Sequence, residues 1–129
     1  MRRILVSTAL MAAGGAMAAD PAGFLAGYQA EARKADAAFA ASAQRGERFF
    51  GTPHGAEWSC ASCHGSPPTA QGKHAKTAKV IAPLAPKANA ERFTDEAKVE
   101  KWFRRNCNDV LGRACTPAEK ADVLAYLLR

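Results

Sequence analysis

The feature that most constrains this chain of 129 residues is the segment Cys60-Ala61-Ser62-Cys63-His64. The C-x-x-C-H pattern is the attachment signature of a c-type haem, in which two thiols add to the haem vinyl groups and the histidine becomes an axial ligand of the iron. A thioredoxin-like dithiol would need a βαβ context, and a zinc site would need two further ligands nearby. Neither surrounds this segment. We therefore predict one covalent haem c, attached through Cys60 and Cys63 with His64 as iron ligand.

Residues 1–18 have the organisation of a secretory signal peptide. Arg2 and Arg3 form a short positive segment, residues 4–17 carry no charge, and Ala16-Met17-Ala18 matches a cleavage site. The apolar run is shorter than the roughly 18 residues that suggest a membrane-spanning helix. The sequence therefore predicts export to the periplasm and a mature domain of residues 19–129 that does not span a membrane.

The predicted mature part is small and mildly basic. The whole chain has 18 Lys and Arg residues against 12 Asp and Glu residues, and two of the arginines lie in the predicted signal peptide. We find no dense stripe of basic residues with interleaved aromatic residues, so nucleic-acid binding is not expected. A modest positive charge is compatible with an acidic protein partner.

The rest of the sequence predicts helices, and no segment shows the alternation typical of a strand. Asp20 is expected to cap a first helix with Pro21 in its first turn. A second apolar-rich helical stretch covers residues 37–50. Residues 51–59 and 65–72 are predicted loops, because glycines and prolines interrupt both periodicities.

Two further helices are predicted in the last third of the chain. Thr94 is expected to cap a helix that carries Val99, Trp102 and Phe103 on one face. Residues 116–119 form a capping box, with proline in the first turn of the last helix. Residues 80–86 are apolar but contain two prolines, so we expect extended backbone there. The predicted fold class is all-α.

The helices on either side of the attachment segment resemble those of class I cytochromes c. Residues 43–50 are similar to the first helix of that class, and residues 121–127 are similar to the terminal helix against which it packs. In this resemblance Gly46 lets the two backbones approach closely, and Tyr126 is the aromatic residue at the contact.

A third resemblance to class I cytochromes c lies in Ile81-Ala82-Pro83-Leu84. It is similar to the Gly-Pro-x-Leu stretch whose proline carbonyl accepts the Nδ1 proton of the proximal histidine. The resemblance implies a hydrogen bond from His64 to the Pro83 carbonyl, which would orient the ring toward the iron.

The second axial ligand is not the methionine that electron-transfer cytochromes c usually employ. Met1, Met11 and Met17 all lie in the predicted signal peptide. The residues alone leave His54, His74, a lysine, an asparagine or water as candidates. Both histidines lie in polar or loop segments, where surface exposure is the expected state.

Cys107 and Cys115 are the only cysteines outside the attachment motif. Because the predicted compartment is oxidising, we expect them to form a disulfide. The short loop that they close would stabilise the fold by about 2.5 kcal/mol. Such a bridge would also hold the chain next to Asn106.

Several stretches of the second half resemble the sphaeroides haem protein (SHP) family, small monohaem cytochromes c that have an asparagine axial ligand and bind oxygen and nitric oxide. Carried over residue by residue, the resemblance implies Asn106 as second iron ligand and Cys107–Cys115 as the family's disulfide. It also implies a class I-like helical fold around one haem. The matching stretches are Ile81-Ala82-Pro83-Leu84-Ala85-Pro86, Arg92-Phe93-Thr94-Asp95, Val99-Glu100-Lys101-Trp102, Arg105-Asn106-Cys107-Asn108, Gly112-Arg113 and residues 116–122.

The resemblance implies a function that depends on the redox state. An amide oxygen is a hard, neutral donor that suits ferric iron better than ferrous iron, so reduction is expected to loosen Asn106 and open a site for oxygen or nitric oxide. The family implies a dihaem cytochrome c as electron donor, with a membrane cytochrome b upstream. The alternatives are an electron carrier whose iron stays six-coordinate and a haem-based gas sensor. The sequence leaves open whether the protein is an enzyme.

The surroundings of the haem are predicted less specifically. Trp58, Trp102 and Phe103 are expected in the core or against the haem. The arginines that could pair with the haem propionates are Arg92, Arg104, Arg105 and Arg113.

Overall fold

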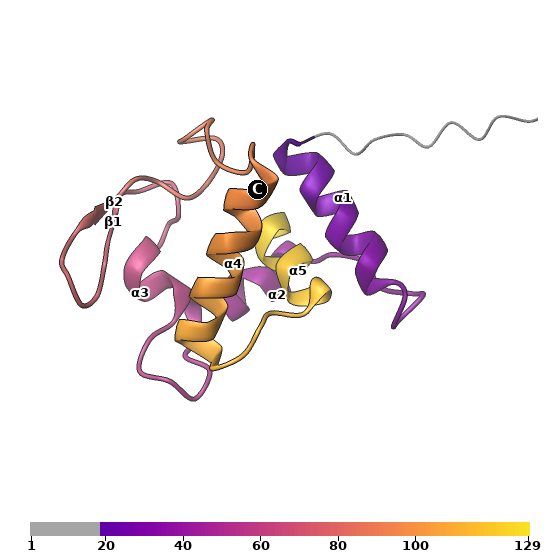
Figure 1. Cartoon of the computed structure of the whole chain (residues 1–129), viewed down its shortest axis with the longest axis horizontal. Coiled ribbons are helices and arrows are strands. Elements are labelled where there is room, and N and C mark those ends of the chain that lie inside the picture. The colour runs from indigo at the N-terminus through magenta and orange to yellow at the C-terminus, as the bar shows by residue number, and fades with distance from the viewer. Residues whose placement is uncertain (1–18) are drawn as a thin grey trace, which may run out of the picture.

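The computed structural model describes residues 19–129, and the predicted signal peptide lies outside them. The described part is mostly helical, which confirms the predicted fold class (Figure 1). None of its helices is long and apolar enough to cross a membrane. In chain order the elements are α1 (Pro21–Ala32), α2 (Ala43–Gly51), α3 (Cys60–His64), β1 (Gly72–Lys73), β2 (Val80–Ile81), α4 (Glu96–Leu111) and α5 (Pro117–Leu127).

The first helix begins as predicted, but the second begins later. Asp20 Oδ1 accepts a hydrogen bond from the Gly23 amide at 2.6 Å, which satisfies one of the free donors at the start of α1. The expected helix over residues 37–50 forms only from Ala43 onward. Asp36 accepts from the Ala38 amide at 3.0 Å, so this segment forms a side-chain-stabilised turn instead. The apolar composition did not reveal that competition.

The core forms where α2 crosses α5. A Cβ atom built on Gly46 would overlap the backbone carbonyl of Asp122, so only glycine permits this approach. The aromatic rings of Phe50 and Tyr126 meet there at 5.5 Å between centroids. Buried Val123 and Leu127 complete the cluster. The predicted contact between the two helices is confirmed.

The caps of the last two helices are determined by side chains close to the predicted ones. Asp95, and not Thr94, caps α4, because its carboxylate accepts from the Lys98 amide at 3.0 Å. The Thr94 hydroxyl instead donates to the Glu91 carbonyl. The predicted capping box of α5 is confirmed by reciprocal hydrogen bonds between Thr116 and Glu119.

A short antiparallel hairpin was not expected from the sequence. Gly72 pairs with Ile81 and Lys73 pairs with Val80, which agrees with extended backbone at the start of residues 80–86. Strands of two residues are too short to show an alternating pattern, since period-2 patterns need about four residues. The hairpin lies beside α3 (Figure 1).

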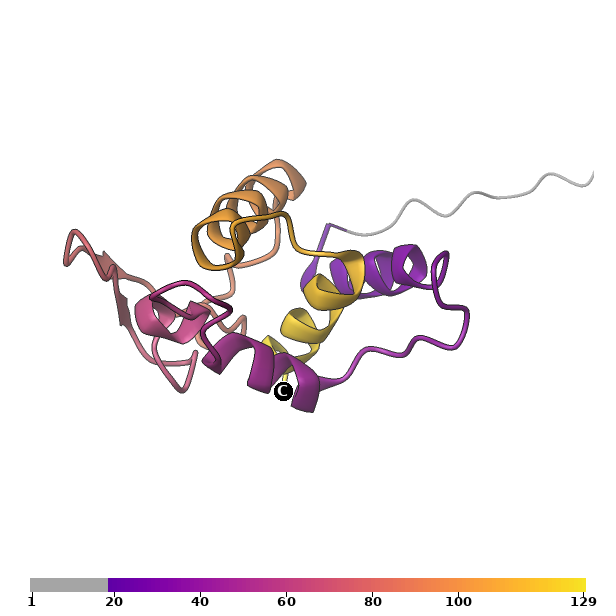
Figure 2. The same ribbon diagram turned by 90° about the horizontal axis from the view of Figure 1, so that it is seen from below.

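Helix α4 is placed differently from the other long helices. α5 packs closely against both α1 and α2, whereas α4 has no comparably close packing against another element of the described part. Figure 2 shows α4 on the side of the molecule opposite α2, with α3 and the hairpin at one end and α1 at the other. Val99, Cys107 and Val110 of α4 are nevertheless buried, and a disulfide holds the end of the helix.

Candidate haem site

The attachment motif forms a helix of little more than one turn. Cys60, Cys63 and His64 are spaced i, i+3 and i+4, which places their side chains on one face of α3. The Ser59 amide donates to the Ser62 hydroxyl at 3.0 Å at the start of the helix, and Gly65, with φ of 74°, ends it. The spacing of the motif thus brings two thiols and an imidazole together on one side of the helix.

The two cysteines of α3 take no part in a disulfide, in contrast to Cys107 and Cys115. Burial raises the pKa of the Cys60 thiol to about 11. The Ala75 amide lies 3.3 Å from Cys63 Sγ and donates to it. Both cysteine residues are half-buried, so a group attached to them would lie against the protein interior.

His64 has a buried ring nitrogen, Nδ1, without a hydrogen-bond partner among residues 19–129. Burial, together with the nearby positive charge of Arg92, lowers the pKa of His64 to about 4. The ring is therefore neutral at pH 7, the form in which histidine binds metal ions. The Phe50 ring lies beside it, with 6.2 Å between centroids, and forms part of its apolar surroundings.

The hydrogen bond that we expected from His64 to the Pro83 carbonyl is not formed in this structure. The Pro83 oxygen instead accepts from Arg92 Nε at 3.0 Å and from Asn89 Nδ2 at 3.4 Å. A carbonyl oxygen has two lone pairs, and both are directed to these donors. The same arginine also donates to the Ala82 carbonyl at 2.7 Å. A competing cation therefore takes the acceptor that the resemblance assigned to the histidine.

Gly72 determines how closely the hairpin approaches the attachment helix. A Cβ atom on this residue would overlap the Cys63 carbonyl and crowd the backbone of His64. Only glycine allows the strand to lie this close. The sequence predicts Gly72 only as a loop residue, and an isolated glycine next to a strand is the signal that could have indicated its role.

The inner face of α4 carries Asn106. Buried Val99 and Val110, together with half-buried Phe103, follow a helical repeat along this face, and Asn106 is the half-buried polar residue within it. The Phe103 ring contacts the Tyr28 ring edge-on, with centroids 5.6 Å apart. An amide in an otherwise apolar stripe is a candidate ligand or hydrogen-bond donor.

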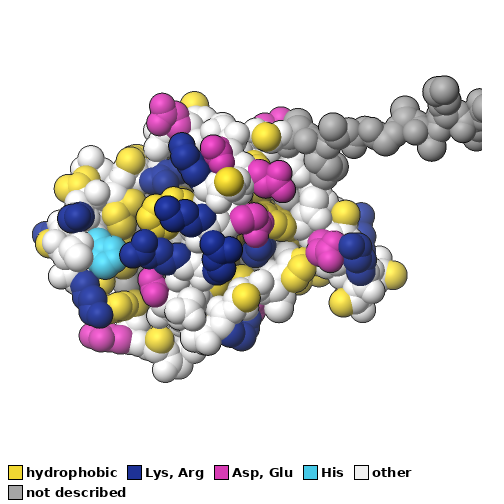
Figure 3. Space-filling view, viewed as in Figure 1, with side chains coloured by type: hydrophobic (Ala, Val, Ile, Leu, Met, Phe, Trp, Pro, Cys, Tyr) yellow, Lys and Arg dark blue, Asp and Glu magenta, His cyan; other side chains and the backbone are white. Residues whose placement is uncertain are grey.

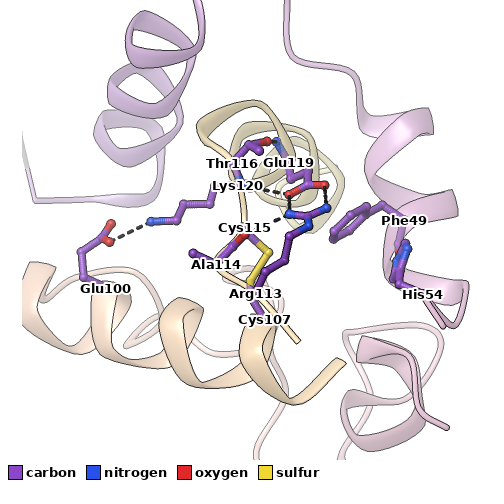
Figure 4. The surroundings of a disulfide bond; sticks show 10 residues. All are labelled: Phe49, His54, Glu100, Cys107, Arg113, Ala114, Cys115, Thr116, Glu119 and Lys120. Carbon is purple, nitrogen blue, oxygen red and sulfur yellow. Dashed lines mark hydrogen bonds and ion pairs between the residues drawn. A yellow bond between two sulfur atoms is a disulfide. The ribbon is translucent and has the colours of Figure 1, made fainter. Parts of the chain in front are cut away.

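The disulfide between Cys107 and Cys115 holds the end of α4. Their Cα atoms are 5.6 Å apart, and the bridge links α4 to the segment before α5 (Figure 4). Next to it, Arg113 binds both carboxylate oxygens of Glu119 at 2.8 and 2.9 Å. The residue before the first cysteine is Asn106, so the cross-link limits how far this part of the helix can move.

The other candidate ligands have local roles. His54 Nε2 lies 2.8 Å from the Phe49 carbonyl, and its ring packs on the Phe49 ring at 4.3 Å. His74 Nδ1 accepts from the amides of Lys76 and Thr77 and so stabilises the hairpin turn. Each histidine therefore has a structural use within its own loop.

The residues predicted to surround the haem do not all lie near the attachment helix. Trp102 is 46% exposed and lies on the flank of α4. Of the four arginines proposed for the propionates, Arg92 is near enough to His64 to affect its pKa. Arg113 is already paired with Glu119, and Arg104 and Arg105 are exposed.

Comparison with known proteins assigns the chain to a family. A family profile described as "Domain of unknown function (DUF1924)" matches residues 36–127. The chain is 49% identical over 133 residues to the cytochrome c-type protein SHP of Cereibacter sphaeroides, covering 98% of each. The chain belongs to the SHP family of c-type cytochromes. It is also 54% identical over 81 residues to cytochrome c'' of Methylophilus methylotrophus, covering 63% of this chain and 56% of that protein.

Solved structures agree with membership of the SHP family. The structure of oxidised SHP, described as an oxygen-binding cytochrome c, matches with a TM-score of 0.72 and 48% identity over 85% of this chain and 96% of that one. Oxidised cytochrome c'' matches with a TM-score of 0.76 and 44% identity over 84% of this chain and 92% of that one. The cofactor is therefore one haem c with its iron.

The residues of this SHP-family chain fit such a haem. Two free thiols and a neutral imidazole with an unpartnered buried nitrogen lie on one face of α3. Among residues 19–129, no group of three or more His, Cys, Asp or Glu side chains is placed to hold a metal ion alone. This donor set suits an iron that is held mainly by a porphyrin and completed by one or two protein ligands.

Proposed function

We propose that this cytochrome is exported, is reduced by a partner cytochrome and binds a diatomic gas, oxygen or nitric oxide, at a haem position released by Asn106. The observation that carries the proposal is the inner face of α4. There Asn106 is the polar residue between Phe103 and Val110, beside the disulfide. The relatives support it, because the SHP structure is described as oxygen-binding and a cytochrome c'' structure is described in terms of haem-ligand detachment.

Three residues of α3 would hold the cofactor. Cys60 and Cys63 would provide the thioether links, and His64 would provide the permanent axial ligand. The haem supplies an iron that changes between ferric and ferrous states and binds a gas at a free axial position. Because Cys60, Cys63 and His64 are half-buried, an iron held by them would be partly screened from water.

The chemistry of Asn106 would couple the redox state to gas binding. Its amide oxygen is a neutral, weak donor that favours ferric iron. Reduction should weaken this interaction and release the side chain. The freed amide still has an N–H group that can donate to a bound gas, and such distal donors help decide what a haem does with its ligand. Because the disulfide holds Cys107, a change of side-chain rotamer is the least costly movement available.

A partner protein would supply the electron that reduces the haem. The family resemblance implies a dihaem cytochrome c, with a membrane cytochrome b upstream. The mildly positive charge of the described part is compatible with an acidic donor.

Optical and EPR spectra of the ferric and ferrous holoprotein, recorded with and without nitric oxide, test the proposal. We expect a ferric spectrum typical of a weak oxygen ligand, a ferrous spectrum with a free axial position, and a strong change when nitric oxide is added to the ferrous protein. A low-spin ferrous spectrum that nitric oxide does not alter would indicate the alternative, an electron carrier with permanently six-coordinate iron.

The ligand itself is tested by Asn106→Ala. We expect this variant to change the ferric spectrum and to raise the affinity of the ferric protein for added ligands such as imidazole. Asn108→Ala is the matched control, because Asn108 is exposed and points away from the inner face of the same helix. If Asn106→Ala left the ferric spectrum unaltered, the assignment of Asn106 as ligand would be wrong.

A further inference from the structure

The outer face of α4 gathers positive charge. Lys98, Lys101, Arg104 and Arg105 are all exposed, and Lys101 lies three or four residues from each of the other three, which places the group along one side of a helix. We call these four residues the basic face of α4. Figure 3 shows Lys and Arg side chains gathered over this helix. The sequence alone did not reveal this group, because Val99, Glu100 and Phe103, which point inward, lie between the basic residues.

None of the four cations of the basic face forms an ion pair within residues 19–129. The ion pairs of this part of the chain engage other cations, namely Lys34, Arg45, Arg113, Lys120 and Arg129. The carboxylate of α4 nearest in sequence, Glu100, binds Lys120 of α5 instead. The four cations therefore have no direct carboxylate partner in this part of the chain, although Arg104 is near enough to Glu100 to help lower the pKa of that carboxyl.

This arrangement costs stability to the helix that carries it. Like charges three or four residues apart destabilise a helix by about 0.2–0.5 kcal/mol per pair. A costly cluster of unpaired cations on one face indicates a binding role more readily than a stabilising one.

An aromatic ring lies at the edge of the basic face. The Lys101 ammonium and the Arg105 guanidinium each lie 5.6 Å from the centre of the Trp102 ring. Tryptophan and arginine are the residues most enriched among those that dominate protein–protein affinity. The surface thus combines a positive field with a large amphipathic contact residue.

The basic face lies on the same helix as the proposed iron ligand. Lys98, Lys101 and Arg105 point outward, whereas Asn106 and Phe103 belong to the inner face. A helix with its side chains is only about 10–12 Å across. A redox protein bound to the outer face would therefore be separated from the inner face by the width of one helix.

We propose that the basic face of α4 is the docking surface for an acidic electron-donating protein. The proposal rests on the function proposed above, in which a partner reduces the haem. Complementary charge would steer the partner to this face and accelerate association, an effect that weakens as salt is added. Trp102 would then contribute contact area once the complex has formed.

The test compares two double charge reversals in the holoprotein. Lys98→Glu/Lys101→Glu removes the charge of the basic face, and Lys73→Glu/Lys79→Glu makes the same change of net charge on the exposed hairpin. The probe is a reduced acidic flavodoxin, mixed with ferric protein in a stopped-flow instrument at several ionic strengths. NMR titration with oxidised flavodoxin maps the binding surface independently of electron transfer.

We expect the α4 variant to lower the second-order rate constant at least tenfold at low salt and to lose most of its salt dependence, while the hairpin variant changes it less than threefold. Shifted NMR signals should lie on α4. Reduction by uncharged lumiflavin semiquinone should be the same in all three proteins, which shows that the haem is intact. Equal loss in both variants, or none in the α4 variant, would overturn the proposal.

The result is independent of the test of gas binding. If nitric oxide binds the ferrous protein as expected but the α4 variant is reduced normally by flavodoxin, only the docking surface is wrong. If nitric oxide does not bind, the docking comparison still decides where an acidic donor associates.

Discussion

Tyr28 of α1 donates a hydrogen bond of 2.5 Å to Glu100 of α4. Lys120 of α5 binds the other carboxylate oxygen at 2.8 Å, so one side chain of α4 connects to two other helices. Burial alone would raise the pKa of Glu100, but the hydrogen bonds from Lys120 and Tyr28 lower it below its ordinary value. This contact, the disulfide and the buried residues of its inner face together set the position of α4.

The hydrogen bond between Tyr28 and Glu100 should be measurable as a coupling energy. Tyr28→Phe removes one donor to a carboxylate, which should cost about 1–2 kcal/mol of unfolding free energy. A double-mutant cycle combines Tyr28→Phe with Glu100→Gln. We expect it to show a coupling energy of about 1 kcal/mol, measured by urea denaturation of the holoprotein. Fully additive effects would mean that the contact contributes nothing to holding α4.

Breaking the disulfide should loosen α4 at its other end. The bridge has a sequence separation of 8, and closing so short a loop is worth about 2.5 kcal/mol. The Cys107→Ser/Cys115→Ser variant should therefore lose that amount of unfolding free energy and unfold at a lower denaturant concentration. Its ferric spectrum should also show a weakened Asn106 ligand, since the residue adjoins the bridge. An unchanged midpoint would indicate that strain in the native state cancels the loop effect.

The crossing of α2 and α5 should not tolerate a methyl group at residue 46. Gly46→Ala puts a Cβ atom into the Asp122 backbone carbonyl, and the backbones must separate at a cost of about 3 kcal/mol. Gly51→Ala is the matched control, because a Cβ atom there meets nothing within 4 Å and should improve helix propensity by up to about 1 kcal/mol. Thermal unfolding of the two holoproteins should therefore shift in opposite directions.

Features set by neighbouring residues could be predicted from the sequence. The spacing of Cys60, Cys63 and His64 and the capping residues Asp20 and Thr116 act over one helical turn, so they can be recognised locally. The contact at Gly46 was predictable only because its helix resembles a known one. Each of these features could be predicted because a short sequence pattern has a single physical interpretation.

Competition between distant groups could not be predicted. The Pro83 carbonyl accepts from Arg92 rather than from His64, and no local pattern ranks two donors that the fold brings together. The same holds for Glu100, whose partners Tyr28 and Lys120 lie 72 and 20 residues away. Such choices depend on tertiary distances, which the sequence does not state.

The capping box of α5 should make stability depend on pH in acid. The side-chain hydrogen bond from Arg113 lowers the pKa of Glu119 more than its partial burial raises it, and contacts with Thr116 lower it further. A carboxyl group with a lowered pKa in the folded state stabilises the protein above its unfolded pKa and loses this effect as pH falls through the folded value. The contribution of Glu119 is therefore present at pH 7 and lost below about pH 4.

Glu119→Gln isolates this contribution, because glutamine can still accept within a capping box. We expect the variant to lose about 0.5 kcal/mol at pH 7, where a negative charge near the start of a helix is favourable. The difference from the parent protein should shrink as the pH falls from 5 to 3, in urea denaturation of the two holoproteins. The stability difference between Arg113→Gln and the parent protein should also shrink over this pH range, but by less, since this variant removes the main cause of the lowered pKa of Glu119. A difference that stays constant from pH 7 to pH 3 would mean that the charge of Glu119 does not stabilise the last helix.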